Sequence, residues 1–335
     1  MMKRSNFLAL FAGLLLFRLL PAQTNLLLNA GFEEALHDQP KSWYSLGTVD
    51  FYRNKNVRKD GAAANTGPEY PEPQEGKNYI GIRSFGDATE VTAGRLEKPL
   101  EKDRWYKIQG YVYRPGADCN TPTAAISVVL SDSIAKTTVW YGYNKKIPSL
   151  ALATADSRPT TEFAWTKVFG WYRARGGERF LWLGDFAGVT GIAPPSKSGV
   201  GMACVFHFYY DAFSVSPSID PQSTLLTVRD ITFDAGSTVI TRVDDPQMTA
   251  LIELLEDYPS YRLEVTGHTD SDGADAFNME LSAKRSEAVK SWLSARGVDV
   301  ARIIAKGMGE TQALVSNDSP EHKAMNRRVE IKILR

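Results

Sequence analysis

The hydrophobic pattern changes its period near residue 220, and this change constrains the fold more than any other feature of the sequence. Before it, short apolar and aromatic runs alternate with polar residues at the two-residue spacing of β-strands. After it, apolar residues recur every three or four positions, as on one face of an α-helix. At 335 residues the chain is also long enough for about two domains. We therefore expect two domains of different structural class.

Residues 1–22 have the composition of an export signal. Lys3 and Arg4 precede an apolar run over residues 7–17, and Ala22 ends a small-residue cleavage site. The apolar run is shorter than the roughly 20 residues that a membrane-spanning helix needs. An uncleaved membrane anchor is the alternative. The sequence therefore predicts a mature protein in an exported compartment.

The charge balance argues against nucleic-acid binding. The chain has 39 basic and 39 acidic residues, and no basic block stands out. A nucleic-acid partner is therefore not expected. The two cysteines, Cys119 and Cys204, both fall in the N-terminal part, where an exported compartment would permit a disulfide. The sequence leaves open whether they form one.

Residues 24–215 have the pattern of an all-β domain. Short runs rich in β-branched and aromatic residues are separated by clusters of Gly, Pro, Asn and Ser, which is typical of a β-sandwich. The clearest runs cover residues 106–113, 125–130, 180–184 and 206–213. We predict a soluble sandwich here, followed by a linker over residues 216–224 that is rich in Pro and Ser.

Residues 225–335 have the pattern of an α+β domain. The expected strands cover residues 225–233, 263–266, 302–305 and 328–333. A first helix begins at Pro246, and a longer one over residues 274–296 ends before Gly297, the usual stop residue. The apolar residues predicted to form the buried side of the longer helix are Leu281, Ala288, Val289, Trp292 and Leu293.

The second domain contains an acidic and a basic residue whose spacing suggests a binding site. Asp270 follows a strand, and Arg285 comes fifteen residues later on the next helix. Together they could bind a small zwitterion, with the Asp270 carboxylate facing the ligand's ammonium and the Arg285 guanidinium facing the ligand's carboxylate. The alternative is structural, with Asp270 capping the following segment and Arg285 solvated. We expect both side chains to be exposed.

The sequence offers no catalytic or metal-binding set. His268 and Asp270 lie two apart on an extended segment without a nucleophile elbow, and Gly273 is misplaced for a calcium loop. Glu33 and Glu34 are neighbours on a strand and point to opposite faces, so they cannot act as a glycosidase pair. We expect no enzyme activity, no cofactor and no metal.

The C-terminal pattern resembles the OmpA-like peptidoglycan-binding domain family over residues 225–334. The motifs that carry the resemblance are Phe233-Asp234, Gly267-His268-Thr269-Asp270, Asn278, Leu281-Ser282, Arg285, Gly307, Gly309-Glu310 and Asn326-Arg327-Arg328-Val329-Glu330. The resemblance implies an α+β domain of order βαβαββ. It also implies that Asp270 and Arg285 bind the diaminopimelate of the peptidoglycan stem peptide, with Thr269, Asn278 and Asp234 lining the same groove. Of Arg327 and Arg328, we expect one to brace the groove and the other to be solvated.

The N-terminal pattern has a looser resemblance to galactose-binding-like jelly-roll modules. It is carried by Asn25-Leu26-Leu27-Leu28-Asn29-Ala30-Gly31-Phe32-Glu33-Glu34, Gly76-Lys77-Asn78-Tyr79-Ile80-Gly81-Ile82 and Tyr210-Asp211-Ala212-Phe213-Ser214-Val215. Such modules bind sugars, calcium or proteins. Six of the seven tryptophans lie in this part, and residues 140–144 form the best candidate loop for sugar stacking. Core packing is the more ordinary role for such aromatic residues.

Together these patterns predict a non-catalytic protein of a Gram-negative envelope, in the periplasm and associated with the outer membrane. Its C-terminal domain would bind peptidoglycan, and its sandwich would face a glycan or protein partner. The alternative is a structural part of a larger secretion, motility or surface assembly in which the sandwich is a docking surface. A cell-wall or glycan hydrolase is the least favoured hypothesis.

Overall fold

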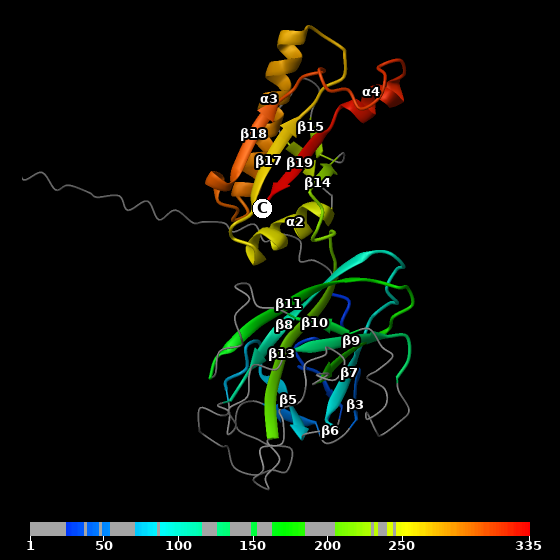
Figure 1. Cartoon of the computed structure of the whole chain (residues 1–335), viewed down its shortest axis with the longest axis vertical. Coiled ribbons are helices and arrows are strands. Elements are labelled where there is room, and N and C mark those ends of the chain that lie inside the picture. The colour runs from blue at the N-terminus through cyan, green and yellow to red at the C-terminus, as the bar shows by residue number, and fades with distance from the viewer. Residues whose placement is uncertain are drawn as a thin grey trace, which may run out of the picture.

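The computed structural model describes the chain in segments that together contain both expected domains (Figure 1). The described residues are 25–36, 39–46, 49–53, 71–85, 88–115, 126–134, 149–152, 163–184, 205–228, 231–233, 240–243 and 246–335. The predicted export signal, both cysteines, the candidate loop 140–144 and Asp234 lie outside them. Within the described segments, no helix combines the length and apolar character needed to cross a bilayer.

The N-terminal part is built from two antiparallel sheets. In the described residues the first sheet has the order β10 (Ser149–Ala151), β9 (Ser127–Ser131), β12 (Phe180–Gly184), β7 (Val91–Arg95) and β3 (Trp43–Leu46). The second has the order β11 (Trp165–Arg173), β8 (Trp105–Tyr113), β13 (Val205–Pro217), β5 (Asn78–Phe85) and β4 (Asp50–Arg53), with β6 (Ala88–Thr89) beside β5. A short pair, β1 (Ala35–Leu36) and β2 (Gln39–Pro40), completes this part.

The core of this domain lies between the two sheets. Side chains from both sheets form one buried cluster, which includes Val128 and Leu181 of the first sheet and Ile108, Val112 and Val215 of the second. Alternate residues of β8 therefore point inward, and Lys107 and Gln109 belong to its outer face. The all-β prediction is confirmed as a β-sandwich, whereas the jelly-roll connection pattern stays a prediction.

The C-terminal domain contains a four-stranded sheet with helices beside it. The sheet order is β14 (Leu225–Val228), β19 (Val329–Leu334), β17 (Arg262–Gly267) and β18 (Ile303–Gly307), and only the β17–β18 pair is parallel. The helices are α2 (Pro246–Asp257), α3 (Asp275–Ser294), the short 3₁₀ turn η2 (Val300–Arg302) and α4 (Pro320–Asn326). Leu251, Leu263, Val289 and Ile331 lie at the centre of its core. The predicted mixture of helices and strands is confirmed.

Three local predictions for this domain were wrong or incomplete. The expected strand over residues 225–233 is divided into β14 and β15 (Ile231–Phe233), and β15 pairs instead with β16 (Ile240–Val243). Helix α4 was not predicted, although Ser319 caps it and Pro320 begins it, which is a recognisable start signal. The order βαβαββ thus omitted both the extra hairpin and α4.

The buried face of α3 differs from the predicted one. Its buried residues are Asn278, Ser282, Ser286, Val289 and Leu293, while Leu281 and Trp292 are half-buried. The cause is a close approach between this helix and the paired ends of β17 and β18. A Cβ atom on Gly267 would lie 2.2 Å from the Ser282 carbonyl oxygen, and one on Gly307 would lie 2.4 Å from the Ala283 nitrogen. Only small side chains therefore fit between the helix and these strand ends.

The substitution Gly307→Ala tests this close approach. The added methyl group would meet backbone atoms of α3, which cannot move aside without displacing the helix, so we expect a loss of about 3 kcal/mol in unfolding free energy. Gly297→Ala is the control, because a Cβ there meets nothing within 4 Å and the cost comes only from the positive φ, about 1 kcal/mol. Equal losses for the two variants in urea unfolding would show that the contact is not tight.

A bulge in β13 buries an acidic side chain in the sandwich. The register against β8 shifts between Asp211 and Ser214. Asp211 is fully buried, and its carboxylate accepts N–H groups from Gln74 at 2.8 Å, Glu75 at 3.1 Å and Ala212 at 2.7 Å. Burial raises the pKa of this carboxyl to about 7, even though the three N–H donors favour its charged form.

The raised pKa of Asp211 predicts a pH-dependent stability. Between pH ~4 and ~7 the folded state holds a proton that the unfolded chain has lost, so this group's contribution to stability falls as pH rises, by about 1.4 kcal/mol per pH unit at the steepest. Asp211→Asn does not titrate, so the melting temperature of the parent relative to this variant should fall between pH 5 and pH 8. Exposed Asp132→Asn is the control. A constant difference between the parent and Asp211→Asn would contradict the assignment.

Candidate functional site

The candidate site forms where β17 ends and the chain turns toward α3. Two backbone hydrogen bonds fix this turn: the His268 N–H donates to the Arg328 carbonyl at 3.0 Å, and the Thr269 N–H donates to the Gly309 carbonyl at 2.9 Å. The Gly309 N–H in turn donates to Ser282 Oγ at 2.8 Å, which ties the same turn to α3. Asp270 is therefore placed by three separate parts of the domain.

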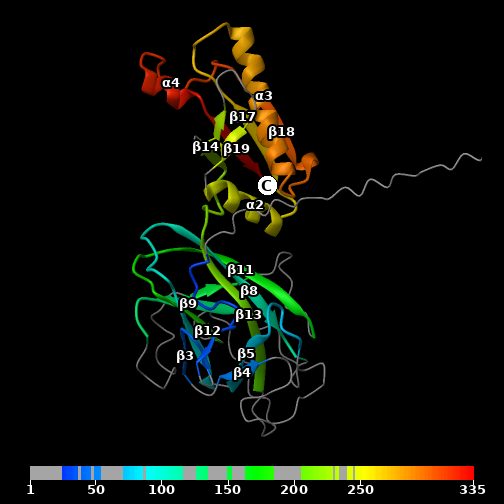
Figure 2. The same ribbon diagram turned by 180° about the vertical axis from the view of Figure 1, so that it is seen from behind.

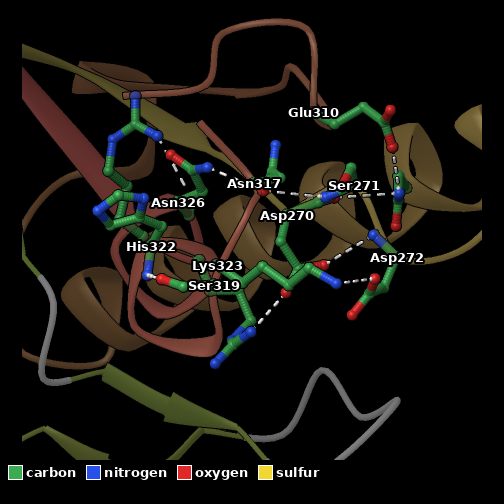
Figure 3. A network of polar contacts seen from close by, with 12 residues as sticks. Asp270, Ser271, Asp272, Glu310, Asn317, Ser319, His322, Lys323 and Asn326 are labelled. Atoms are coloured by element: carbon green, nitrogen blue, oxygen red, sulfur yellow. Dashed lines mark hydrogen bonds and ion pairs between the residues drawn. The ribbon is translucent and has the colours of Figure 1, made fainter. Parts of the chain in front are cut away.

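Asp270 is buried rather than exposed, so the expected exposure was wrong. Only 10% of its side chain is accessible, and both carboxylate oxygens are occupied. The Asp272 N–H donates to Oδ1 at 3.1 Å, and the Arg327 guanidinium donates to Oδ2 at 2.5 Å (Figure 3). The carboxylate is buried because a turn and an arginine surround it, and the pairing with Arg327 neutralises its charge.

Arg285 lies close to this ion pair and is half-buried. Its pKa is lowered, first because burial disfavours the charged form and then because the positive charge of Arg327 repels its own; the charge of Asp270 partly offsets both effects. Two guanidinium groups therefore lie within electrostatic reach of one carboxylate. A ligand carboxylate could interact with both guanidinium groups.

The partners and exposure of Arg327 and Arg328 differ in part from the prediction. Arg327 makes the ion pair with Asp270 although 46% of its side chain is accessible. Arg328 is buried rather than solvated, and it donates to Glu330 at 2.8 Å and to the Gln312 carbonyl at 3.1 Å. The expectation of one solvated arginine was therefore wrong, because the second one fastens the segment before β19 to the preceding loop.

Asn278 joins the turn to the segment after β18. It is buried, and its Nδ2 donates to the Asp270 carbonyl at 3.2 Å and to Glu310 Oε2 at 2.6 Å. Figure 3 shows Glu310 and Asn326, the last residue of α4, on different sides of Asp270. Glu310 was not chosen as a site residue from the sequence, although it belongs to the Gly309-Glu310 motif.

Thr269 provides a buried hydroxyl next to Asp270. Only 3% of Thr269 is accessible, and its Oγ1 has no hydrogen-bond partner among the described residues. His268 is also buried, and burial together with Arg328 lowers its pKa, so the ring is neutral at pH 7. Its nearest acid is Glu330, at 3.8 Å. Asp234, the remaining predicted site residue, lies outside the described residues.

The loop before α4 and the last residue of α4 close one side of the site. Asn326 accepts the Leu314 N–H at 2.8 Å and the Val315 N–H at 3.1 Å, and it donates to Asn317 at 2.9 Å. Asn317 accepts the Ser271 N–H at 3.3 Å. Figure 3 shows Asn326, Asn317 and Ser271 joined by hydrogen bonds beside Asp270. The network therefore connects the loop before α4 to the turn that carries Asp270.

A further polar contact and an apolar rim complete the surroundings. Lys323 of α4 makes an ion pair with Asp272 at 2.6 Å. Phe277 and Met279, which flank Asn278 on α3, and Leu314 are large apolar residues that remain exposed. In the part of the chain that the structure describes, no three His, Cys, Asp or Glu residues gather closely enough to hold a metal ion. The site is thus suited to recognise charge beside apolar surface.

A separate hollow of about 260 Å³ lies on the sandwich. Gln109, Tyr111, Glu75, Lys167 and Ser214 are among the residues that line it. Gln109 Oε1 and Ser214 Oγ are buried and have no hydrogen-bond partner among the described residues. Residues of the bulge in β13 are also part of its lining, and a bulge has no distinct hydrophobic period by which it could be predicted from the sequence.

The family comparison matches residues of the C-terminal domain, and similar proteins match part of the chain. Residues 232–327 match the model of the OmpA family, so the chain contains an OmpA-family domain. Probable lipoprotein YiaD of Escherichia coli is 40% identical over 30% of this chain and 46% of its own length. Peptidoglycan-binding protein ArfA of Mycobacterium tuberculosis is 32% identical over 43% of this chain and 40% of its own length.

Solved structures also match about a third of the chain. The structure described as the cell wall anchor of the T6SS from Pseudomonas aeruginosa is 30% identical, with a TM-score of 0.29, and the match covers 33% of this chain and 79% of that one. The chain spans less than half the length of the curated relatives named above. The galactose-binding-like resemblance of the sandwich stays a prediction.

Proposed function

We propose that this chain is a non-catalytic cell-envelope protein whose OmpA-like domain binds peptidoglycan through the diaminopimelate of the stem peptide. The observation that carries the proposal is the grouping of the Asp270 carboxylate with two guanidinium groups, those of Arg285 and Arg327. The relative ArfA, named as a peptidoglycan-binding protein, supports the choice of ligand. The predicted export signal and the OmpA-family domain support a location in the periplasm, associated with the outer membrane.

Binding would proceed by exchange of ionic partners. The free end of the diaminopimelate side chain has an ammonium and a carboxylate on one carbon. The ammonium would take the place of Arg327 at Asp270, and the released Arg327 would join Arg285 in binding the ligand carboxylate. The Thr269 hydroxyl, which has no hydrogen-bond partner among the described residues, would gain one. Asn278 would hold the Asp270 backbone in place.

The ligand's alkyl chain would contact the apolar rim. Phe277, Met279 and Leu314 are exposed, and contact with a ligand would remove apolar surface from water. His268 is buried, which supports a non-catalytic role for this arrangement. The sandwich would face a glycan or protein partner, and its polar hollow offers one place for hydroxyl-rich groups.

The exchange mechanism predicts that Asp270→Asn and Arg285→Ala weaken binding to diaminopimelate-type peptidoglycan by at least about tenfold, because each leaves a ligand charge unpaired. Co-sedimentation of the mature chain with purified peptidoglycan measures this effect, and free diaminopimelate should compete. Asparagine is chosen at position 270 because it keeps the shape of the aspartate side chain. Asp270 is buried and hydrogen-bonded, so removing its side chain would also disturb the fold.

The controls come from the same helix. Glu280 and Lys284 form an exposed ion pair on α3, so Glu280→Ala and Lys284→Ala remove comparable charges away from the site. These variants should sediment like the parent. Retention of Asp270→Asn at the level of the parent would refute the proposed site. Failure of the parent itself to sediment would refute peptidoglycan binding and favour the alternative of a scaffold in a larger assembly.

A further inference from the structure

A buried ion cluster joins α2 of the C-terminal domain to the outer face of the sandwich. Lys107 of β8 makes an ion pair with Asp257 at the end of α2 and lies 3.7 Å from Glu253. Lys167 of β11 donates to the second Asp257 oxygen at 3.1 Å. The side chains of Lys107 and Asp257 are 1% and 2% accessible. These charges are therefore taken out of water by contact between the two domains.

This cluster has no role within either domain alone. Tyr106 and Ile108 fill the sandwich core, so Lys107 points away from it. Asp257 lies at the C-terminal end of α2, where the helix dipole disfavours a negative charge. A buried lysine or aspartate is strongly destabilising unless it is paired. The pairing of Lys107 and Lys167 with Asp257 therefore favours one specific arrangement of the domains.

Aromatic rings extend the contact beside the ions. Trp171 of β11 stacks on Tyr258, with centroids 5.7 Å apart and an angle of 19° between the planes. Phe169 meets the same tyrosine edge-on at 6.2 Å, and Tyr258 stacks on Tyr261 at 4.6 Å. The Lys107 ammonium lies 5.7 Å from the Phe169 ring, which adds a cation–π contact. The interface thus combines buried charge with ring stacking.

The connecting segment is fastened to both domains. Ser218 donates its N–H to the Trp105 carbonyl at 2.8 Å and accepts the Trp171 indole N–H at 3.2 Å. Ile219 is buried in the core of the C-terminal domain. Arg335 donates to the carbonyls of Pro221 at 2.7 Å and Ser223 at 3.1 Å. The predicted linker therefore has partners on both sides.

The interface and the Asp270 site lie at opposite ends of the C-terminal domain. Strand β17 begins at Arg262, just after the stacked tyrosines, and ends at Gly267, just before the site turn. Figures 1 and 2 both show α2 between the sheet and the sandwich, whereas α4 lies at the far end of the domain. A ligand at Asp270 would therefore lie on the side away from the sandwich.

We propose that the two domains form one rigid unit, docked through the Lys107–Asp257–Lys167 cluster and the Trp171–Tyr258 stack. The docking surface on the sandwich is the outer face of β8 and β11, and its partner is the C-terminal end of α2 in the same chain. The docking itself does not depend on the proposed ligand. Its consequence, a sandwich projected away from the cell wall, rests on the proposed function.

The substitution Lys107→Glu tests the docking in the full mature chain. It places a third carboxylate beside Asp257 and Glu253, so the domains should separate while each stays folded. Small-angle X-ray scattering should show a larger maximum dimension, and proteolysis within residues 218–224 should become about tenfold faster as local protection is lost. Far-UV circular dichroism should be unchanged. Lys98→Glu, an equal charge change at an exposed sandwich residue, is the control.

The outcomes separate docking from loss of fold. If Lys107→Glu loses its circular dichroism signal, Asp257→Asn decides the question, because it keeps the side-chain shape and removes the charge that pairs with both lysines. A larger dimension for either folded variant supports the proposal. Unchanged scattering and proteolysis for a folded variant, or a parent that is already extended, would overturn it. Peptidoglycan sedimentation of the same variants is a separate readout, since Lys107 and Asp257 lie outside the binding site.

Discussion

The close approach of α3 to the paired ends of β17 and β18 determines the geometry of the C-terminal site. Gly267 and Gly307 leave no side chain in the way, and Ser282 fills the remaining space while accepting the Gly309 N–H. Because the helix lies so near, Asn278 reaches the Asp270 carbonyl and Glu310. A larger residue at either glycine would lift the helix away and separate the residues that Asn278 joins. The polar contacts of the site therefore depend on the close packing that the two glycines allow.

Much of this arrangement could be predicted from the sequence, because the hydrophobic pattern and the motif spacing both indicate it. The change in hydrophobic period separated an all-β part from an α+β part, and motif spacing placed Asp270 and Arg285 near one another. The buried face of α3 could not be predicted in the same way. Apolar spacing favoured Leu281 and Trp292, but the helix buries Ser282 and Ser286, since steric room and not hydrophobicity decides that contact.

The partners of the charged residues were also beyond sequence reasoning. Arg327 and Arg328 are neighbours of identical type, and only the fold shows that the first reaches Asp270 while the second fastens a loop. The same holds for Lys107, which lies in a strand with an ordinary alternating pattern yet meets an aspartate 150 positions later. Such pairings depend on long-range packing, and no local pattern encodes them.

The position of β17 has a mechanical consequence. This strand lies between β18 and β19, with the site turn at one end and the domain interface near the other. A pull applied between the site turn and the sandwich would act roughly along the strand, so the hydrogen bonds to both neighbours would bear the load in shear. They would have to break together, whereas a pull across the sheet would unzip them one at a time. The C-terminal domain thus places a strand that is paired on both sides along the line of tension.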